Sequence, residues 1–141
     1  MERSPEVYLV RERMRQTGLD FWLDVHGDEA LPYNFIAGSD GVAELPEHIR
    51  QARHDYEAAL VRASPDFQTK YGYPKAPVGT GDLRKATNQL ANRFKALAMT
   101  LEQPFKDNAD APDEQVDWSP ARCKALGRAN LDALHTVLDK L

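Results

Sequence analysis

The sequence contains a single cysteine, Cys123, among its 141 residues. A disulfide bond within the chain is therefore excluded, and we expect Cys123 to be a buried, inert thiol on a helix. With one cysteine, the reducing cytoplasm is the simplest compartment, so the sequence predicts a cytoplasmic protein. No hydrophobic run reaches the ~18 residues that a membrane span needs, and no signal peptide precedes the first predicted helix.

An excess of basic residues is also absent. The chain has 18 lysines and arginines against 22 aspartates and glutamates, a formal net charge of -4. This balance argues against nucleic acid as the main partner. The length fits a single domain over residues 1–141, and a chain of this size can bury roughly 70% of its extended surface.

Helical and strand patterns alternate along the chain, which predicts an α/β fold. We expect helices over residues 5–17, 46–63, 82–94 and 120–141, and strands over residues 21–26, 34–37 and 96–102. Ser-Pro pairs at residues 4–5 and 119–120 are typical helix starts. The apolar face expected for the last helix is formed by Leu131, Leu134, Leu138 and Leu141.

The first chemical motif follows a predicted strand. Residues 20–25 alternate with period 2, as in a half-buried strand, and His26 falls where that strand is expected to end. Gly27 allows a sharp turn, and the carboxylates Asp28 and Glu29 come directly after it. Loops at strand ends carry the chemistry of many α/β folds. His26 is therefore a candidate site residue, although a surface histidine in an acidic loop is the alternative interpretation.

A second predicted strand also ends in a chemically capable residue. The apolar run of residues 96–101 stops at Glu102, and Pro104 is expected to prevent further pairing. Glu102 could be a solvated strand end. Two strands that each end in a group able to bind metal or move protons instead favour a site built from His26 and Glu102.

These stretches resemble the M14-type zinc carboxypeptidases, on the branch of the cytosolic carboxypeptidases and their bacterial relatives. The resemblance rests on Asp-Val-His-Gly-Asp-Glu at residues 24–29 with Leu-Pro-Tyr-Asn-Phe at 31–35, and on Thr-Leu-Glu at 100–102 with Pro-Phe-Lys-Asp at 104–107. It implies that His26 is the last of three protein ligands of Zn²⁺ and that Glu102 is the general base. It also implies a partial mixed β-sheet flanked by helices, as in the C-terminal half of the catalytic domain.

The other motifs of that family have no counterpart in this chain. An earlier His-x-x-Glu motif and an Asn-Arg pair are missing, so the remaining zinc ligands are expected outside these residues. The resemblance makes peptide or protein C-termini the expected substrate. Asp24, two residues before His26, is a candidate partner for its imidazole. Tyr33 and Asp28 are candidates for lining a substrate pocket, and Tyr71 or Tyr73, on a long loop, could contact substrate.

Two alternatives to an active peptidase follow from the same residues. The chain could be a catalytically incomplete fragment that acts as a structural or oligomerising unit, as a homo-oligomer or with a complementary N-terminal segment. The apolar face expected on the last helix would suit self-association. A weaker alternative is an unrelated amide hydrolase that uses His26 with Asp28 or Glu29.

Overall fold

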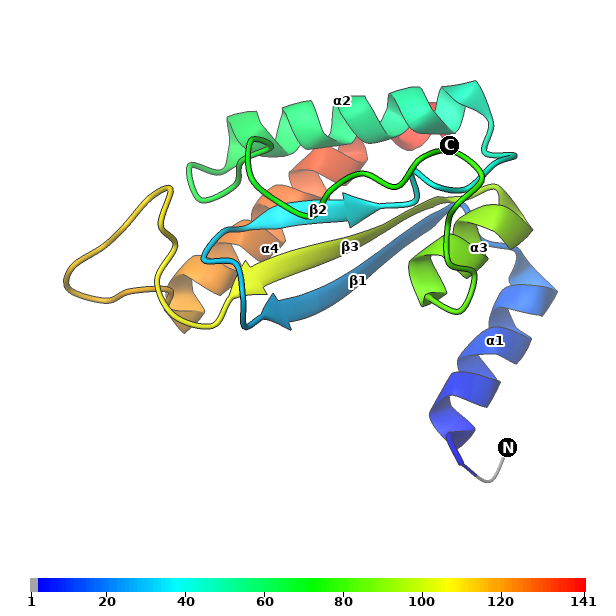
Figure 1. Cartoon of the computed structure of the whole chain (residues 1–141), viewed down its shortest axis with the longest axis horizontal. Coiled ribbons are helices and arrows are strands. Elements are labelled where there is room, and N and C mark those ends of the chain that lie inside the picture. Colours follow the sequence, from blue (N-terminus) through cyan, green and yellow to red (C-terminus); the bar gives the residue numbers. More distant parts are fainter. Residues whose placement is uncertain (1–2) are drawn as a thin grey trace.

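A computed structural model describes residues 3–141, so Met1 and Glu2 lie outside the described residues. Its elements are α1 (Pro5–Thr17), β1 (Phe21–Asp28), β2 (Phe35–Gly38), α2 (Glu47–Ala63), α3 (Ala86–Phe94), β3 (Leu97–Pro104), α4 (Pro120–His135) and a 3₁₀ turn, η1 (Leu138–Lys140). Figure 1 shows the three strands side by side with helices around them. The predicted α/β class, with a mixed sheet flanked by helices, is confirmed.

The sheet has the order β1-β3-β2, so the last strand in the sequence is the central one. Strand β3 runs parallel to β1 and antiparallel to β2. A parallel pair needs a long crossover, and here α2, the following loop and α3 supply it. This topology places residues 21–28 and 97–104 in one continuous register.

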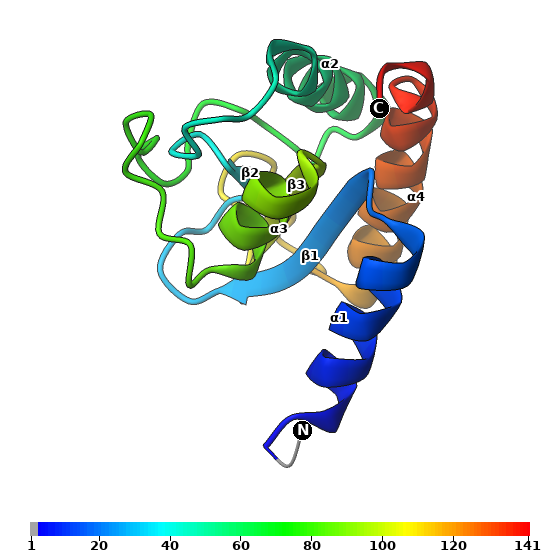
Figure 2. The ribbon, with the colours of Figure 1, turned by 90° about the vertical axis from the view of Figure 1, so that its right-hand side faces the viewer.

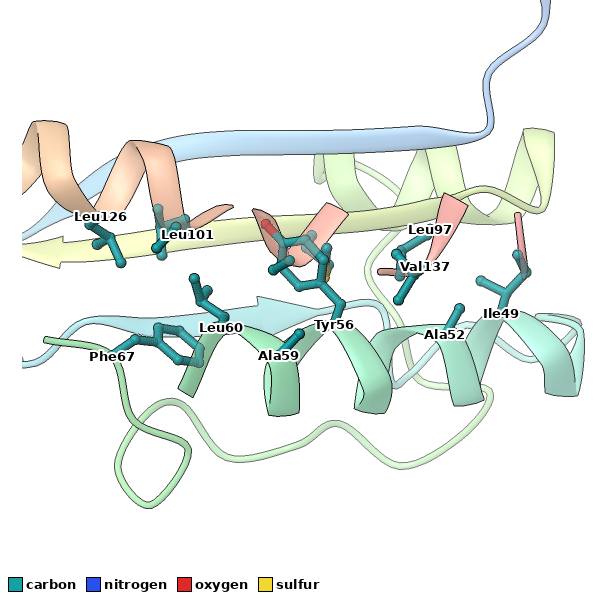
Figure 3. Packing of buried hydrophobic residues seen from close by; sticks show 13 residues of the cluster. Ile49, Ala52, Tyr56, Ala59, Leu60, Phe67, Leu97, Leu101, Leu126 and Val137 are labelled. Atoms are coloured by element: carbon teal, nitrogen blue, oxygen red, sulfur yellow. The ribbon is translucent and has the colours of Figure 1, made fainter. Parts of the chain in front are cut away.

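The main core lies between one face of the sheet and helices α2 and α4. Tyr56 and Leu60 of α2, Leu97 and Leu101 of β3, and Leu126 of α4 are at most 3% exposed. Figure 3 shows these side chains meeting between the helices and the sheet. The predicted second helix, residues 46–63, thus supplies much of this core through α2.

The opposite face of the sheet packs against α3. Leu90 and Ala91 of α3 and Ala98 of β3 are buried there, with Met14 of α1, and Trp22 packs against them. Figure 2 shows α3 and α4 on opposite sides of β1. Because side chains alternate along a strand, residues 22, 24 and 26 of β1 and 98, 100 and 102 of β3 all face the α3 side.

Two expected strand ends are wrong by two residues. Strand β1 continues through Gly27 to Asp28, so His26 lies within the strand and not at its end. Strand β3 likewise continues past Glu102 to Pro104, which pairs with Asp28. Strand β2 pairs with β3 only from Met99 to Glu102, so beyond that point only β1 lies beside β3 and a proline is tolerated.

The expectations for the third and fourth helices also need correction. Helix α3 begins at Ala86, because Asp82 accepts hydrogen bonds from Arg84 within a turn that precedes the helix. Helix α4 ends at His135 and buries Leu126, Ala129, Asn130 and Ala133. Leu131 and Leu138 are 67% and 51% exposed, so the buried face is rotated away from the expected leucine stripe.

Candidate functional site

His26 and Glu102 lie opposite each other on adjacent parallel strands. They are paired in the register of β1 and β3, and both side chains project to the α3 side of the sheet. The His26 Nδ1 atom lies 3.8 Å from Glu102 Oε1. The pairing of two strands that are separated by the whole crossover thus brings the two predicted site residues together.

The two side chains differ in exposure. The Glu102 residue is 7% exposed, whereas the His26 side chain is 51% exposed. Burial raises the pKa of Glu102 above its ordinary value, the nearby His26 lowers it, and Asp28, Asp24 and Glu29 raise it again. A carboxylate with a raised pKa can both accept and return a proton at neutral pH.

Asp24 lies beside the other nitrogen of the His26 ring. Its Oδ2 atom is 3.2 Å from Nε2, and its side chain is 32% exposed. The two ring nitrogens thus face different carboxylates, Nε2 that of Asp24 and Nδ1 that of Glu102. Asp24 therefore occupies the position expected of a residue that orients the imidazole.

Asp28 is held by hydrogen bonds and is 4% exposed. Its Oδ1 atom accepts from the backbone amides of Ala30 and Leu31, at 2.7 and 3.2 Å. Its Oδ2 atom accepts from the Tyr73 hydroxyl at 2.6 Å. Burial alone would raise the pKa of Asp28, but these hydrogen bonds outweigh it and lower the pKa. Asp28 is thus an ionised anchor for the loop that carries Tyr73.

That loop covers part of a cleft of about 1320 Å³ on the α3 side of the sheet. The residues that line the cleft include His26, Glu102, Tyr73, Thr100, Lys75 and Lys85. The Tyr73 ring meets Phe35 edge to face, with 5.0 Å between the ring centres. Tyr33 does not line the cleft and instead stacks on Tyr71 at 4.4 Å.

Sequence reasoning missed several lining residues. The hydroxyls of Thr87 and Thr100 are 2.7 Å apart and join α3 to β3 inside the cleft. Lys85, the residue just before α3, also lines the cleft. Because side chains alternate along β3, Thr100 lies on the same face of the sheet as Glu102. This alternation was the one feature of the sequence that pointed to Thr100 as a lining residue.

A complete metal site is not formed by these residues alone. Among residues 3–141, no three histidine, cysteine, aspartate or glutamate side chains come together in a way that could hold a metal ion. His48 and His54 lie on α2, and His135 ends α4. His26, beside Glu102, is a candidate for one metal ligand, and the described residues do not bring two further ligands to it. In the same range, no helix has the length and apolar character needed to span a membrane.

Comparisons with known proteins give three informative matches. No family model matches the chain. An uncharacterized protein of Zymomonas mobilis is 49% identical over 140 residues, which are 99% of this chain and 37% of that protein. A crystal structure from Shewanella denitrificans, provisionally named carboxypeptidase A, is 49% identical with a TM-score of 0.95. A metallo-carboxypeptidase from Pseudomonas aeruginosa, in complex with (2-guanidinoethylmercapto)succinic acid, is 37% identical with a TM-score of 0.94.

The match covers nearly all of this chain but a minor part of each relative. In both solved structures it spans 99% of this chain and 37% of the other. The chain therefore has a carboxypeptidase-like fold and corresponds to about a third of the length of the proteins that it matches.

Proposed function

We propose that this chain is part of an M14-type zinc carboxypeptidase, corresponding to the C-terminal portion of its catalytic domain, which removes C-terminal residues from peptides. The observation that carries the proposal is the direct pairing of His26 with Glu102 in the cleft. Support comes from the structural match to a protein named as a metallo-carboxypeptidase, at 37% identity.

In this proposal His26 supplies one zinc ligand through Nδ1. The residues fit this role, because Asp24 lies at Nε2 and Nδ1 is left on the Glu102 side. When bound, zinc lowers the pKa of a water towards ~7 and polarises the peptide carbonyl. The other protein ligands belong to the part of the domain outside these residues, because residues 3–141 hold no group of three.

Glu102 acts as the general base. Its carboxylate accepts a proton from the attacking water and returns it to the leaving amine as the peptide bond breaks. Burial and nearby carboxylates raise its pKa, against the lowering effect of His26, which suits a group that must take up and release a proton in turn. Asp24 orients His26, and Asp28 holds the Tyr73 loop beside the cleft.

The test uses a graft that supplies the missing part of the domain. This chain replaces the matched 37% of the Pseudomonas aeruginosa metallo-carboxypeptidase, and release of C-terminal amino acids from peptides is measured. We expect Glu102→Gln to lower kcat by about 10²- to 10⁴-fold with the zinc content unchanged.

Glu29→Gln is the matched control, because Glu29 is an exposed carboxylate near the same site. A loss of activity in Glu29→Gln equal to that in Glu102→Gln would favour the amide hydrolase alternative. A folded graft without carboxypeptidase activity would contradict the proposal. For the isolated chain, one metal ligand and a base predict no peptidase activity.

A further inference from the structure

Gln68 lies near the start of the loop between α2 and α3, lines the cleft and is 7% exposed. Its Oε1 atom accepts hydrogen bonds from the backbone amides of Lys70 and Tyr71, at 2.7 and 2.6 Å. Its Nε2 atom donates to the carbonyl oxygens of Asn34 and Tyr71, both at 3.0 Å. A side-chain amide offers two donor hydrogens and one oxygen with two lone pairs. All of this capacity is used in Gln68, and every partner is a backbone group.

These hydrogen bonds attach the loop to the residue that precedes β2. The carbonyl oxygen of Asn34 accepts from the backbone amide of Gln68 at 3.4 Å as well as from its side chain. Asn34 is 0% exposed and donates through Nδ2 to the carbonyl oxygen of Asp66 at 3.1 Å. It also forms an isolated parallel bridge with Phe67. Because buried polar groups are costly to leave unpaired, the loop begins from a firmly held point.

The two residues that follow the turn of residues 68–71 both meet the ring of Phe35. A Cβ atom at position 72 would lie 2.8 Å from Phe35 Cδ2, so Gly72 permits this close approach. Tyr73 packs edge to face on the same ring, and its hydroxyl donates to Asp28 Oδ2 at 2.6 Å. The turn that Gln68 closes therefore delivers the chain directly to the position of Tyr73.

Tyr73 is a neighbour of the candidate site. It lines the same cleft as His26 and Glu102, and its partner Asp28 follows His26 by two residues on β1. Burial raises the pKa of Tyr73 most, and the hydrogen bond to Asp28 and the charge of Glu102 raise it further. Tyr73 is therefore close enough to Glu102 for the two groups to interact electrostatically.

We propose that Gln68 is a positioning residue for peptide binding: it closes the turn of residues 68–71, joins that turn to Asn34 and so holds Tyr73 in place as part of the cleft wall. The inference rests on the proposed function for its substrate. Gln68 acts through Tyr73, whereas the proposed zinc ligand and general base lie on the paired strands β1 and β3. Loss of the Gln68 amide therefore weakens the binding of a peptide more than it slows the chemical step.

The first test measures peptidase kinetics in the graft described under the proposed function. Gln68→Met keeps the length of the side chain and removes its N–H donors. We expect KM to rise about tenfold, with kcat within about threefold and the zinc content unchanged. Gln51→Met is the matched control, because Gln51 is exposed on α2 and donates to Asp55 at 3.1 Å. Its KM should stay within about twofold.

A double-mutant cycle tests whether Gln68 acts through Tyr73. We expect Tyr73→Phe alone to raise KM about tenfold, and Gln68→Met in the same chain to add no more than about threefold. Independent roles would instead multiply to about a hundredfold. A purely structural role of Gln68 would lower kcat and the zinc content together and would not depend on Tyr73.

A second variant serves where Gln68→Met does not fold, which circular dichroism checks. Gln68→Glu keeps oxygen acceptors for the amides of Lys70 and Tyr71 but sets a carboxylate against the carbonyl oxygen of Asn34. The turn can thus close while its attachment to β2 is lost. We expect the same rise in KM, with kcat again within about threefold.

Amide exchange in the 141-residue chain measures the same coupling without substrate or zinc. Gln68→Met should accelerate the exchange of residues 70–78 about tenfold and leave β1, β3 and α2 unchanged. A graft without peptidase activity contradicts the proposed function. Unchanged exchange at residues 72–78, effects of Gln68→Met and Tyr73→Phe that multiply in full, or an unchanged KM in an active graft would each overturn the role of Gln68.

Discussion

Gly38 of β2 lies directly against the guanidinium of Arg53. A methyl group at position 38 would overlap Nη1 and Cζ of that side chain. Arg53 is 9% exposed and is held by Asp40 at 2.6 Å and Glu57 at 2.9 Å. The absent side chain at position 38 therefore makes room for the buried Arg53 guanidinium, whose partly buried ion pair with Asp40 joins α2 to the loop after β2.

We expect Gly38→Ala to lower the free energy of unfolding by about 1–3 kcal/mol, because the buried Arg53 cannot move without breaking its partly buried ion pairs. Gly27→Ala is the matched control. A methyl group there would also overlap a side chain, that of Phe105, but this ring is 67% exposed and can swing into solvent. We expect Gly27→Ala to cost about 1 kcal/mol or less. Urea unfolding followed by circular dichroism distinguishes the two, and equal losses would contradict this account.

At the scale of elements, the loop between α2 and α3 is joined to β1 by the hydrogen bond from Tyr73 to Asp28. Desolvation and this hydrogen bond raise the pKa of Tyr73 well above its ordinary value, so the hydroxyl stays a neutral donor over the physiological range. Residues 71–80 are all exposed. The ends of the loop are held by hydrogen bonds of Gln68 with Tyr71 and of Gly79 and Gly81 with Gly41, so the hydrogen bond of Tyr73 holds the middle of the loop.

Tyr73→Phe removes this donor and should accelerate amide exchange of residues 72–78 by about tenfold, with a small change in global stability. Tyr33→Phe is the control: its ring stacks on Tyr71, and its hydroxyl makes no hydrogen bond within residues 3–141. Hydrogen exchange read by mass spectrometry compares the two. Unchanged exchange in Tyr73→Phe would show that the loop is held by other contacts.

Much of the element pattern was predictable from local sequence. The alternation of residues 20–25 and the Ser-Pro starts of α1 and α4 depend on neighbouring residues only, and these elements lie where expected. The ends of β1 and β3 were not predictable, because each strand extends as far as its partner supports it. The buried face of α4 depends on how the helix is rotated against α2, which a stripe of leucines does not determine.

The candidate site was also predictable only in part, because some of its residues follow local strand patterns and others come together only through long-range contacts. His26 and Glu102 were found because each follows a strand pattern, and their pairing then depends on the strand order β1-β3-β2. The contact between Tyr73 and Asp28 joins residues that are 45 positions apart and has no local signature. Lys85 lines the cleft from just before α3, at a position that the apolar pattern places within the helix.

For the molecule as a whole, these residues form a recognisable carboxypeptidase-like fold with half of a proposed site. The cleft, its buried glutamate and one histidine lie on the α3 side of the sheet.

The most direct test is the zinc content of the graft in which this chain replaces the matched part of the Pseudomonas aeruginosa metallo-carboxypeptidase. Plasma mass spectrometry after gel filtration without chelator gives zinc per chain. Our account predicts close to one zinc in the graft and in its His135→Ala control, and close to none in His26→Ala, because a catalytic zinc needs its third protein ligand. A graft that keeps one zinc in His26→Ala would contradict the role of His26 at the centre of this account.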